Sequence, residues 1–130
     1  MPAIEAAASL RSTTSDMLKF LKANLFFEDD SGLSSALRYC MSTRTDPMFS
    51  FYNRFASKLT YGVQSTEIGL GWVVAKLKDI QIIQHSGGTE GFSTTMILNP
   101  DNRIGAVVLT NAALKDNVVL SLKLLKNLLD

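Results

Sequence analysis

Residues 92–110, FSTTMILNPDNRIGAVVLT, hold the pattern that decides the fold. Two candidate strand segments, 92–98 and 104–110, flank the sequence Asn99-Pro100-Asp101-Asn102, whose residue types favour tight turns. This spacing predicts two antiparallel strands joined by a short turn. The second segment is almost continuously apolar, so we expect it to be buried on both faces.

Two further strands are expected upstream, over 68–74 and 80–85, joined through Leu77-Lys78-Asp79. Downstream, leucines and valines at helical spacing predict a C-terminal helix that packs across the sheet. One apolar face of this helix is formed by Val118, Leu122, Leu125 and Leu129, with Leu120, Leu124 and Leu128 widening it and Lys123 and Lys126 on the polar side.

The N-terminal half is predicted to be helical. Thr13 and Asp16 have the spacing of a capping box before an apolar-periodic stretch, which predicts a helix near 14–27. A second short helix is expected over 33–41, and residues 42–66 are expected to be a partly ordered connection.

The predicted fold class is therefore α+β, an antiparallel sheet of about four strands with flanking N- and C-terminal helices. We expect a single domain over 1–130, with a lead-in at 1–9, a helical part at 10–66, the sheet at 67–112 and the C-terminal helix at 113–130.

Composition argues against several classes of partner. With 13 basic and 12 acidic residues, the net charge of +1 offers no attraction to nucleic acid or an anionic membrane. A single cysteine, Cys40, allows neither an internal disulfide nor a thiolate metal site, and it is expected to be a small buried hydrophobe. We expect no metal and no cofactor.

The sequence leaves the cellular location open. It contains no apolar run near the ~18 residues that a membrane span needs, and its first residues lack the pattern of a signal peptide. These features fit a cytoplasmic protein, or an exported parent protein whose leader is not in this sequence.

One stretch suggests chemistry, His85-Ser86-Gly87-Gly88-Thr89-Glu90-Gly91-Phe92. Glycines beside a strand remove side chains, so that a ligand can lie against the backbone, whose N–H groups can bind a carbonyl oxygen. A histidine there can donate a hydrogen bond or carry a proton near neutral pH. A glycine-rich turn with a structural histidine has the same composition, so the residues alone leave both interpretations open.

The sequence resembles a known enzyme family. His-x-Gly-Gly-Thr-x-Gly-Phe after Gly-x-Gly-Trp is similar to the third motif of the class C serine β-lactamases and their penicillin-binding-protein-like esterase and D-aminopeptidase relatives. That motif is Lys-Thr-Gly in the lactamases and often His-x-Gly in the esterases. The segments 10–17, 97–105 and 107–111 are also similar to the family's pattern, in the same order, so the resemblance runs from about residue 9 to the C-terminus.

The resemblance implies a role for each motif position. His85 stands where the lactamases keep lysine and is the candidate catalytic residue. Ser86 and Gly87 stand at the threonine and glycine of the motif, and Gly88 would supply a backbone N–H to the oxyanion hole. Ser86, Gly87, Gly88 and Thr89 form the expected substrate-binding set. The implied substrate is a small acyl compound, an ester or a β-lactam, and histidine in place of a permanent cation favours the ester.

Two motifs of the family are absent from this sequence. Its nucleophile is a serine followed three residues later by lysine, which helps to remove the serine proton. No serine here has lysine at that spacing, and no tyrosine is followed by asparagine in the second motif, Tyr-x-Asn. Both motifs lie earlier in the family's chains, so the sequence resembles the C-terminal part of a longer hydrolase, inactive or nearly inactive alone.

Two other functions remain open. An improvised small hydrolase could use His85 with Ser86, Ser93 or Ser65, although neighbouring side chains such as His85 and Ser86 point to opposite faces of a strand. A non-catalytic binding or assembly module is the other alternative. In the family, N-terminal strands pair with the last strand, so segment 104–110 would have an open edge here. We therefore expect a homodimer or higher oligomer through this edge or the apolar helix face.

Overall fold

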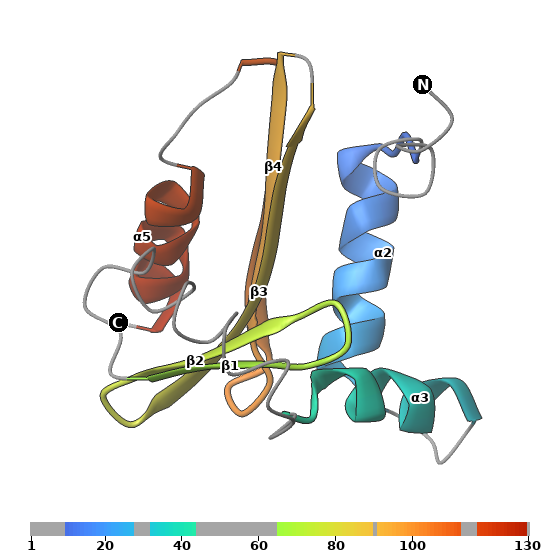
Figure 1. Cartoon of the computed structure of the whole chain (residues 1–130), viewed down its shortest axis with the longest axis vertical. Helices are drawn as coiled ribbons and strands as arrows, with labels where there is room; N and C mark the ends of the chain where they lie inside the picture. Colours follow the sequence, from blue (N-terminus) through green and yellow to red (C-terminus); the bar gives the residue numbers. More distant parts are fainter. Residues whose placement is uncertain (1–9, 28–31, 44–64, 90, 113–116, 130) are drawn as a thin grey trace.

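The computed structural model describes residues 10–27, 32–43, 65–89, 91–112 and 117–129. Among these residues, two helices precede a run of five strands, and one helix follows it (Figure 1). In chain order these elements are α2 (Thr14–Leu25), α3 (Gly32–Met41), β1 (Ser65–Ile68), β2 (Val73–Leu77), β3 (Ile80–Thr89), β4 (Phe92–Asn99), β5 (Ile104–Thr110) and α5 (Asn117–Leu129).

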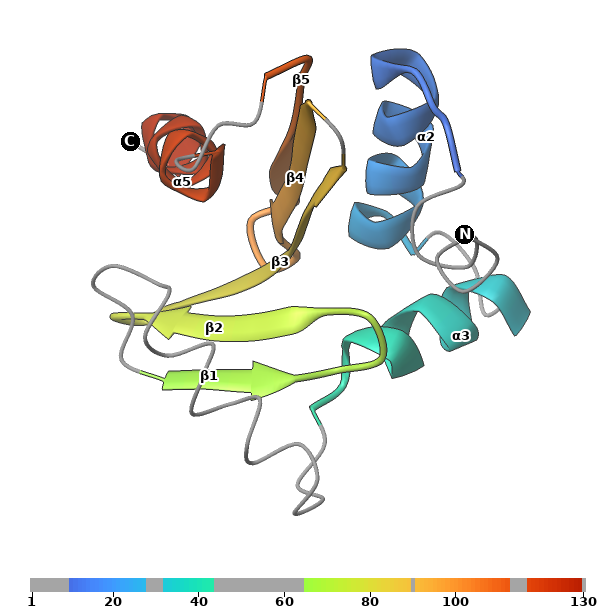
Figure 2. The same cartoon turned by 45° about the horizontal axis from the view of Figure 1, so that its top comes forward.

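The five strands form one antiparallel sheet in the order β1-β2-β3-β4-β5. β3 is long enough that its two halves have different neighbours. Its first half pairs with β2 as far as Gln84, opposite Val73, and its pairing with β4 runs from Ile83 to Thr89. β1 and β2 therefore lie at one end of β3, as Figure 2 shows, while the other end of β3 has β4 on one side only.

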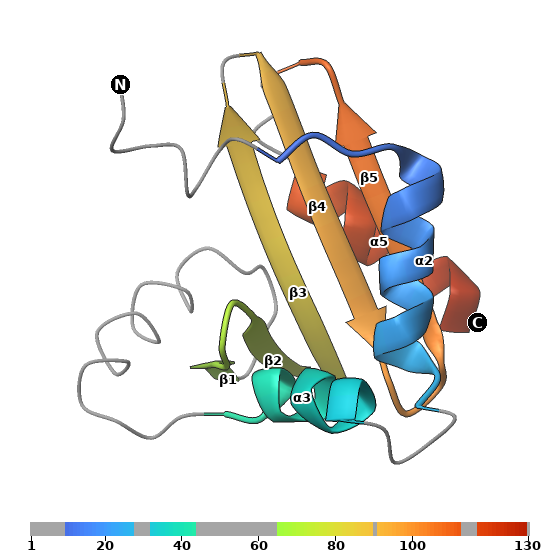
Figure 3. The same ribbon diagram turned by 90° about the vertical axis from the view of Figure 1, so that its right-hand side faces the viewer.

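Helices cover both faces of the sheet where β4 and β5 lie. α2 packs on one face, mainly over β5, and α5 packs on the other, over β4 and β5 (Figure 3). Leu98 of β4 faces Leu21 and Leu25 of α2, whereas its neighbour Ile97 faces Leu125 of α5. Both β4 residues are 0% exposed, which makes this strand the centre of the core. The expected α+β class, with helices flanking the sheet, is confirmed.

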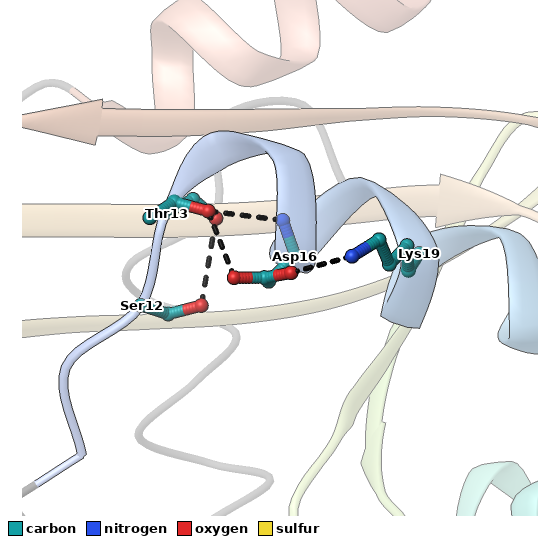
Figure 4. A network of polar contacts seen from close by, with 4 residues as sticks. All are labelled: Ser12, Thr13, Asp16 and Lys19. Carbon is teal, nitrogen blue, oxygen red and sulfur yellow. Dashed lines mark hydrogen bonds and ion pairs between the residues drawn. The ribbon is translucent and has the colours of Figure 1, made fainter.

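The predicted capping box opens α2 (Figure 4). The Thr13 hydroxyl accepts a hydrogen bond from the Asp16 backbone N–H at 3.2 Å and donates one to the Asp16 carboxylate at 3.0 Å. Lys19 donates to the other carboxylate oxygen at 2.8 Å. These hydrogen bonds, first that of Lys19 and then that of Thr13, hold the pKa of Asp16 below its ordinary value.

Two glycines are required by packing. A Cβ on Gly105 would lie 2.8 Å from both the Ile97 carbonyl oxygen and Leu21 Cδ1, so the bare backbone lets α2 approach β5. A Cβ on Gly69 would overlap the Cys40 carbonyl oxygen, the group that accepts a hydrogen bond from Leu70 at 2.8 Å. Gly69 thus allows the C-terminal end of α3 to contact the β1–β2 turn.

The predicted strand over 68–74 is wrong, and the sheet has five strands where about four were expected. Residues 69–72 form a turn between β1 and β2, because Gly71 adopts a φ of 77° and Gly69 packs against α3. The strand predicted over 80–85 continues to Thr89, since Gly87 and Gly88 keep extended backbone and pair with β4. The turn after β4 is confirmed, and the Asn99 side chain holds it by accepting from the Asn102 N–H at 2.7 Å.

Burial at the end of the chain differs from the prediction in two ways. β5 is covered by α2 on one face and by α5 on the other, but most of its side chains are only half-buried, and Val108, at 8% exposed, is the one buried residue of the strand. On α5, Leu125 is buried and Lys123 and Lys126 are exposed, as expected. Leu120, Leu124 and Leu128 do not widen the packed face but are exposed.

The remaining predictions concern the first half of the chain. The helices expected at 14–27 and 33–41 are confirmed within two residues. Cys40, near the end of α3, is half-buried and packs against the core. Most of the expected connection at 42–66, and the expected lead-in at 1–9, lie outside the described residues.

We expect Gly105→Ala to destabilise the protein by about 1–3 kcal/mol, because the added methyl group forces β4 or α2 to move. Denaturant unfolding followed by circular dichroism measures this loss. Gly87→Ala is the matched control, since a Cβ there meets nothing within 4 Å. Equal losses for the two variants would contradict the packing role of Gly105.

Acid should weaken the start of α2. A carboxyl whose pKa is lowered on folding stabilises the folded state above its unfolded pKa, and that contribution is lost as the pH falls through its folded pKa. The melting temperature of Asp16→Asn should therefore lie below that of the wild type at pH 7, and the gap should close below about pH 4. A gap that persists at pH 2 would show that Asp16 acts through something other than its charge.

Candidate functional site

The second half of β3 forms a bare edge of the sheet. All five residues from His85 to Thr89 are exposed, in contrast to Ile82, Ile83 and Gln84, which are buried just before them. The change occurs where pairing with β2 stops at Gln84. Because backbone groups alternate in direction along an antiparallel ladder, every second residue of 85–89 turns its N–H and C=O toward this free edge.

His85 and Ser86 lie on opposite faces of the sheet. His85 is opposite Met96, which belongs to the core beneath α2, and Ser86 is opposite Thr95, on the face that α5 covers. The other serines considered with His85 are no closer to a catalytic pair. Ser93 shares the face of Ser86 and Gly88, and Ser65 starts β1, opposite Lys76 of β2. The structure therefore does not bring any of these serines against His85.

Gly87 and Gly88 differ from the glycines that packing or backbone conformation requires. A Cβ on Gly87 would meet nothing within 4 Å, and one on Gly88 would make only an ordinary contact at 3.4 Å with the Phe92 carbonyl oxygen. Neither has a positive φ, whereas Gly91 in the following turn has a φ of 83°. Two glycines where side chains would fit and the backbone is ordinary leave the strand edge open to a ligand.

A shallow hollow of about 290 Å³ lies beside this edge, between β3, β4 and the start of α5. Two of the residues that line it, Thr95 and Asn117, are only 2% and 4% exposed, and each has a buried polar atom, Thr95 Oγ1 and Asn117 Oδ1. Neither atom has a hydrogen-bond partner in the described part of the chain. The wall is completed by Ser86, Gly87, Gly88, Ser93, Thr94 and Val118.

A polar network ties the start of α5 to the strands beneath the hollow. The Asn117 side-chain amide donates to Ser93 Oγ at 2.6 Å, and the Ser93 and Thr110 hydroxyls are 2.9 Å apart. Ser93 also donates to the Ala112 carbonyl at 2.9 Å. Sequence reasoning missed Asn117 and Thr95, and it considered Ser93 only as a possible partner of His85. The signal of the two missed residues is weak: Thr95 is one of three consecutive polar residues in a strand, and Asn117 is a polar residue at the start of a helix.

A second hollow, of about 350 Å³, lies around the β2–β3 turn and near Asp101. It is larger than the first, but its wall carries ordinary side chains such as Glu67, Lys76 and Asp79 and no exposed glycine backbone. Over the described residues, no group of three or more His, Cys, Asp and Glu side chains is placed to hold a metal ion. The glycine-lined edge of β3 is therefore the better candidate for binding a substrate.

Comparison with protein families agrees with the resemblance seen in the sequence. A family model described as Beta-lactamase matches residues 1–126, nearly the whole chain. The chain belongs to the β-lactamase family. No curated protein matches it. The match includes α2, the whole sheet and all but the last turn of α5, so the β-lactamase-family part of this chain contains both the bare edge of β3 and the network around Asn117.

None of the helices that the structure describes in this family member is long and apolar enough to cross a membrane.

We expect Asn117→Ala to destabilise this β-lactamase-family chain by about 1–3 kcal/mol, because it removes the 2.6 Å hydrogen bond to the buried Ser93 hydroxyl. Asn127→Ala is the control, since Asn127 is exposed on the same helix and its loss should change stability by less than about 0.5 kcal/mol. Thermal or urea unfolding measures both. A loss no greater than that of the control would contradict the anchoring role of Asn117.

Proposed function

We propose that the β3 edge from His85 to Thr89 is the substrate-binding wall of a β-lactamase-like serine hydrolase, and that this chain corresponds to the C-terminal part of such an enzyme. The observation that carries the proposal is the run of five exposed residues on a strand whose edge is free and whose glycines are needed by neither packing nor backbone conformation. Family membership gives this edge its chemical interpretation.

In this proposal each position has a separate role. Gly88 offers its backbone N–H to the oxygen of the reacting carbonyl, where negative charge develops in the tetrahedral intermediate. Ser86 and Thr89 offer hydroxyl groups to the rest of the substrate, and Gly87 keeps the approach free of side chains. His85, exposed on the α2 face, donates a hydrogen bond to the substrate or transfers a proton.

In this proposal the chain lacks the nucleophile that attacks the carbonyl carbon of the substrate. No serine in it is followed by lysine at the family's spacing, and the geometry of β3 places Ser86 and His85 on opposite faces. A serine hydroxyl without a neighbouring base is a weak nucleophile, so binding the substrate does not lead to acyl transfer. We therefore propose that the nucleophile and the Tyr-x-Asn motif belong to a part of the enzyme that this sequence lacks, and that the chain alone is inactive.

The substrate class that best fits this wall is a small neutral acyl compound, an ester before a β-lactam. A β-lactam carries a carboxylate, which a permanent cation binds best, and the position of the family's lysine is His85 here. The improvised hydrolase is not supported, because the described strands place no serine hydroxyl beside His85 on its own face of the sheet.

The test separates binding from turnover. We expect no hydrolysis of p-nitrophenyl butyrate or nitrocefin above the buffer rate. Ethyl butyrate should nevertheless shift the amide signals of residues 85–89 in nitrogen–proton NMR spectra. Gly88→Val, which fills the open edge, should weaken this binding at least about tenfold, equivalent to ~1.4 kcal/mol.

Lys76→Val is the matched control, because Lys76 is exposed on β2, away from the hollow beside β3, and its variant should bind like the wild type. Signal changes outside residues 85–89, or equal binding by Gly88→Val, would contradict the proposal that this edge is the substrate-binding wall. Robust turnover that a single Ser→Ala change abolishes would contradict the proposal that the chain lacks a nucleophile.

A further inference from the structure

We propose that Ser93 is a positioning residue for the substrate-binding wall. Its contacts with Thr110 and Asn117 hold the end of β4 in place, and β4 in turn keeps the backbone N–H of Gly88 turned toward the bare edge of β3. This inference rests on the proposed function, because it concerns the group that binds the reacting carbonyl oxygen there. Ser93 does not contact the substrate; it acts through the pairing of β4 with β3.

The direction of the Gly88 backbone follows from the register of three strands. Ser93 of β4 is the partner of Gly88 on one side and of Thr110 of β5 on the other. The Ser93 carbonyl oxygen accepts a hydrogen bond from Thr110 Oγ1 at 3.0 Å, so it points toward β5 and away from β3. In an antiparallel ladder the N–H and C=O of one residue point the same way. Gly88 and Ser93 are therefore a pair without mutual backbone hydrogen bonds, and the Gly88 N–H points to the bare edge.

The residues on either side of Gly88 attach β3 to β4. Because the direction of the backbone groups alternates, Gly87 and Thr89 turn their N–H and C=O toward β4. β2 pairs with β3 only as far as Gln84, so β4 is the one described strand that holds β3 at this level (Figure 3). The position of the Gly88 N–H therefore depends on the position of β4.

Two features of the described strands make this end of the sheet prone to open. Ser93 and Thr110 are the last pair of the β4–β5 ladder, and the ends of a ladder open more readily than its centre. Gly87 and Gly88 in the adjoining part of β3 have no side chains to pack, and they gain more backbone freedom than other residues when the strand opens. Side-chain contacts are therefore needed to keep this end closed.

Ser93 supplies these contacts on the face that α5 covers. Its hydroxyl donates to the Ala112 carbonyl at 2.9 Å and accepts from the Asn117 side-chain amide at 2.6 Å. Ser93 and Asn117 are only 8% and 4% exposed, so water competes little for these hydrogen bonds. Asn117 is itself held in the first turn of α5, where Ser121 Oγ donates to its carbonyl at 2.7 Å. One serine side chain thus joins β4 to the chain after β5 and to α5.

A fixed strand end matters for the proposed site because a hydrogen-bond donor helps a reaction only when it is held in place. Binding groups must stay within about 0.5 Å of their working geometry to be effective. Gly88 has no side chain that could fix its own position, and a strand end that opens part of the time presents its N–H in several directions. The fixed geometry therefore comes from the partner strand, through Ser93.

Hydrogen exchange followed by nitrogen–proton NMR on the whole chain tests the geometry without a ligand. In the wild type the Gly87 and Thr89 amides should exchange slowly and the Gly88 amide rapidly. Ser93→Ala should speed the exchange of Gly87 and Thr89 at least about tenfold, because the strand end opens more often. The Ile83 amide, which faces β4 by the same alternation near the other end of β3, should change much less.

Binding of ethyl butyrate measures the consequence for the site. Ser93→Ala should weaken this binding at least about fivefold, because the donor is no longer preorganised. Ser93→Thr keeps the hydroxyl and should restore both the slow exchange of Gly87 and the binding. Gly105→Ala is the control for lost stability, since it disturbs packing at the other end of β5 and should bind ethyl butyrate like the wild type.

The possible results separate this inference from the proposed function. A slowly exchanging Gly88 amide, or equal exchange of Gly87 in the wild type and Ser93→Ala, would overturn the role of Ser93. Faster exchange with unweakened binding by Ser93→Ala would overturn it as well. Failure of the wild type to bind ethyl butyrate would overturn the proposed function, while the exchange rates would still show whether Ser93 holds this strand end.

Discussion

The burial of β4 on both faces is the constraint on which the rest of the structure depends. Ile97 and Leu98 are neighbours in the chain and point in opposite directions, and each is fully buried beneath a different helix. Backbone pairing then places β3 and β5 on either side of β4. The bare edge of β3 is positioned through this strand, since β4 is the one described neighbour of β3 beyond Gln84.

The glycines of the sheet fall into three physical classes. Gly69 and Gly105 exist because another part of the chain approaches their backbone too closely for a side chain. Gly71 and Gly91 adopt positive φ values that side chains disfavour. Gly87 and Gly88 meet neither condition, although glycine in a strand costs conformational entropy. Residues that lower stability without a structural reason are typical of functional sites. This property distinguishes Gly87 and Gly88 from the glycines in the neighbouring turns.

The polar groups beside the bare edge support the same interpretation. Buried polar atoms without partners are rare, because each costs free energy unless a hydrogen bond compensates. Thr95 Oγ1 and Asn117 Oδ1 belong to residues that line the hollow with Ser86 and Gly88, and neither atom has a partner among the described residues. The Thr95 hydroxyl can donate or accept a hydrogen bond, whereas the Asn117 amide oxygen can only accept one. The fold therefore holds polar groups close to a strand edge that is lined by glycine backbone.

The sequence by itself determined the α+β class, the capping box of α2, the turn after β4, the bounds of β5 and the family to which the glycine-rich motif belongs. These features depend on local residue types and spacing, which can be recognised from neighbouring positions in the sequence. Sequence reasoning could not find the β1–β2 turn, because the roles of Gly69 and Gly71 depend on contact with α3 and on one backbone angle.

Only the tertiary structure decided which apolar residues are buried. β5 has the composition of a core strand but is the last strand of the described sheet, and Leu120, Leu124 and Leu128 of α5 are exposed. How many neighbours a residue has depends on strand order and helix placement and not on hydrophobicity alone. The tertiary structure likewise joined Asn117 to Ser93 across 24 residues and set His85 and Ser86 on opposite faces of a strand longer than the sequence predicted. Long-range pairing creates these relations, and no local pattern encodes them.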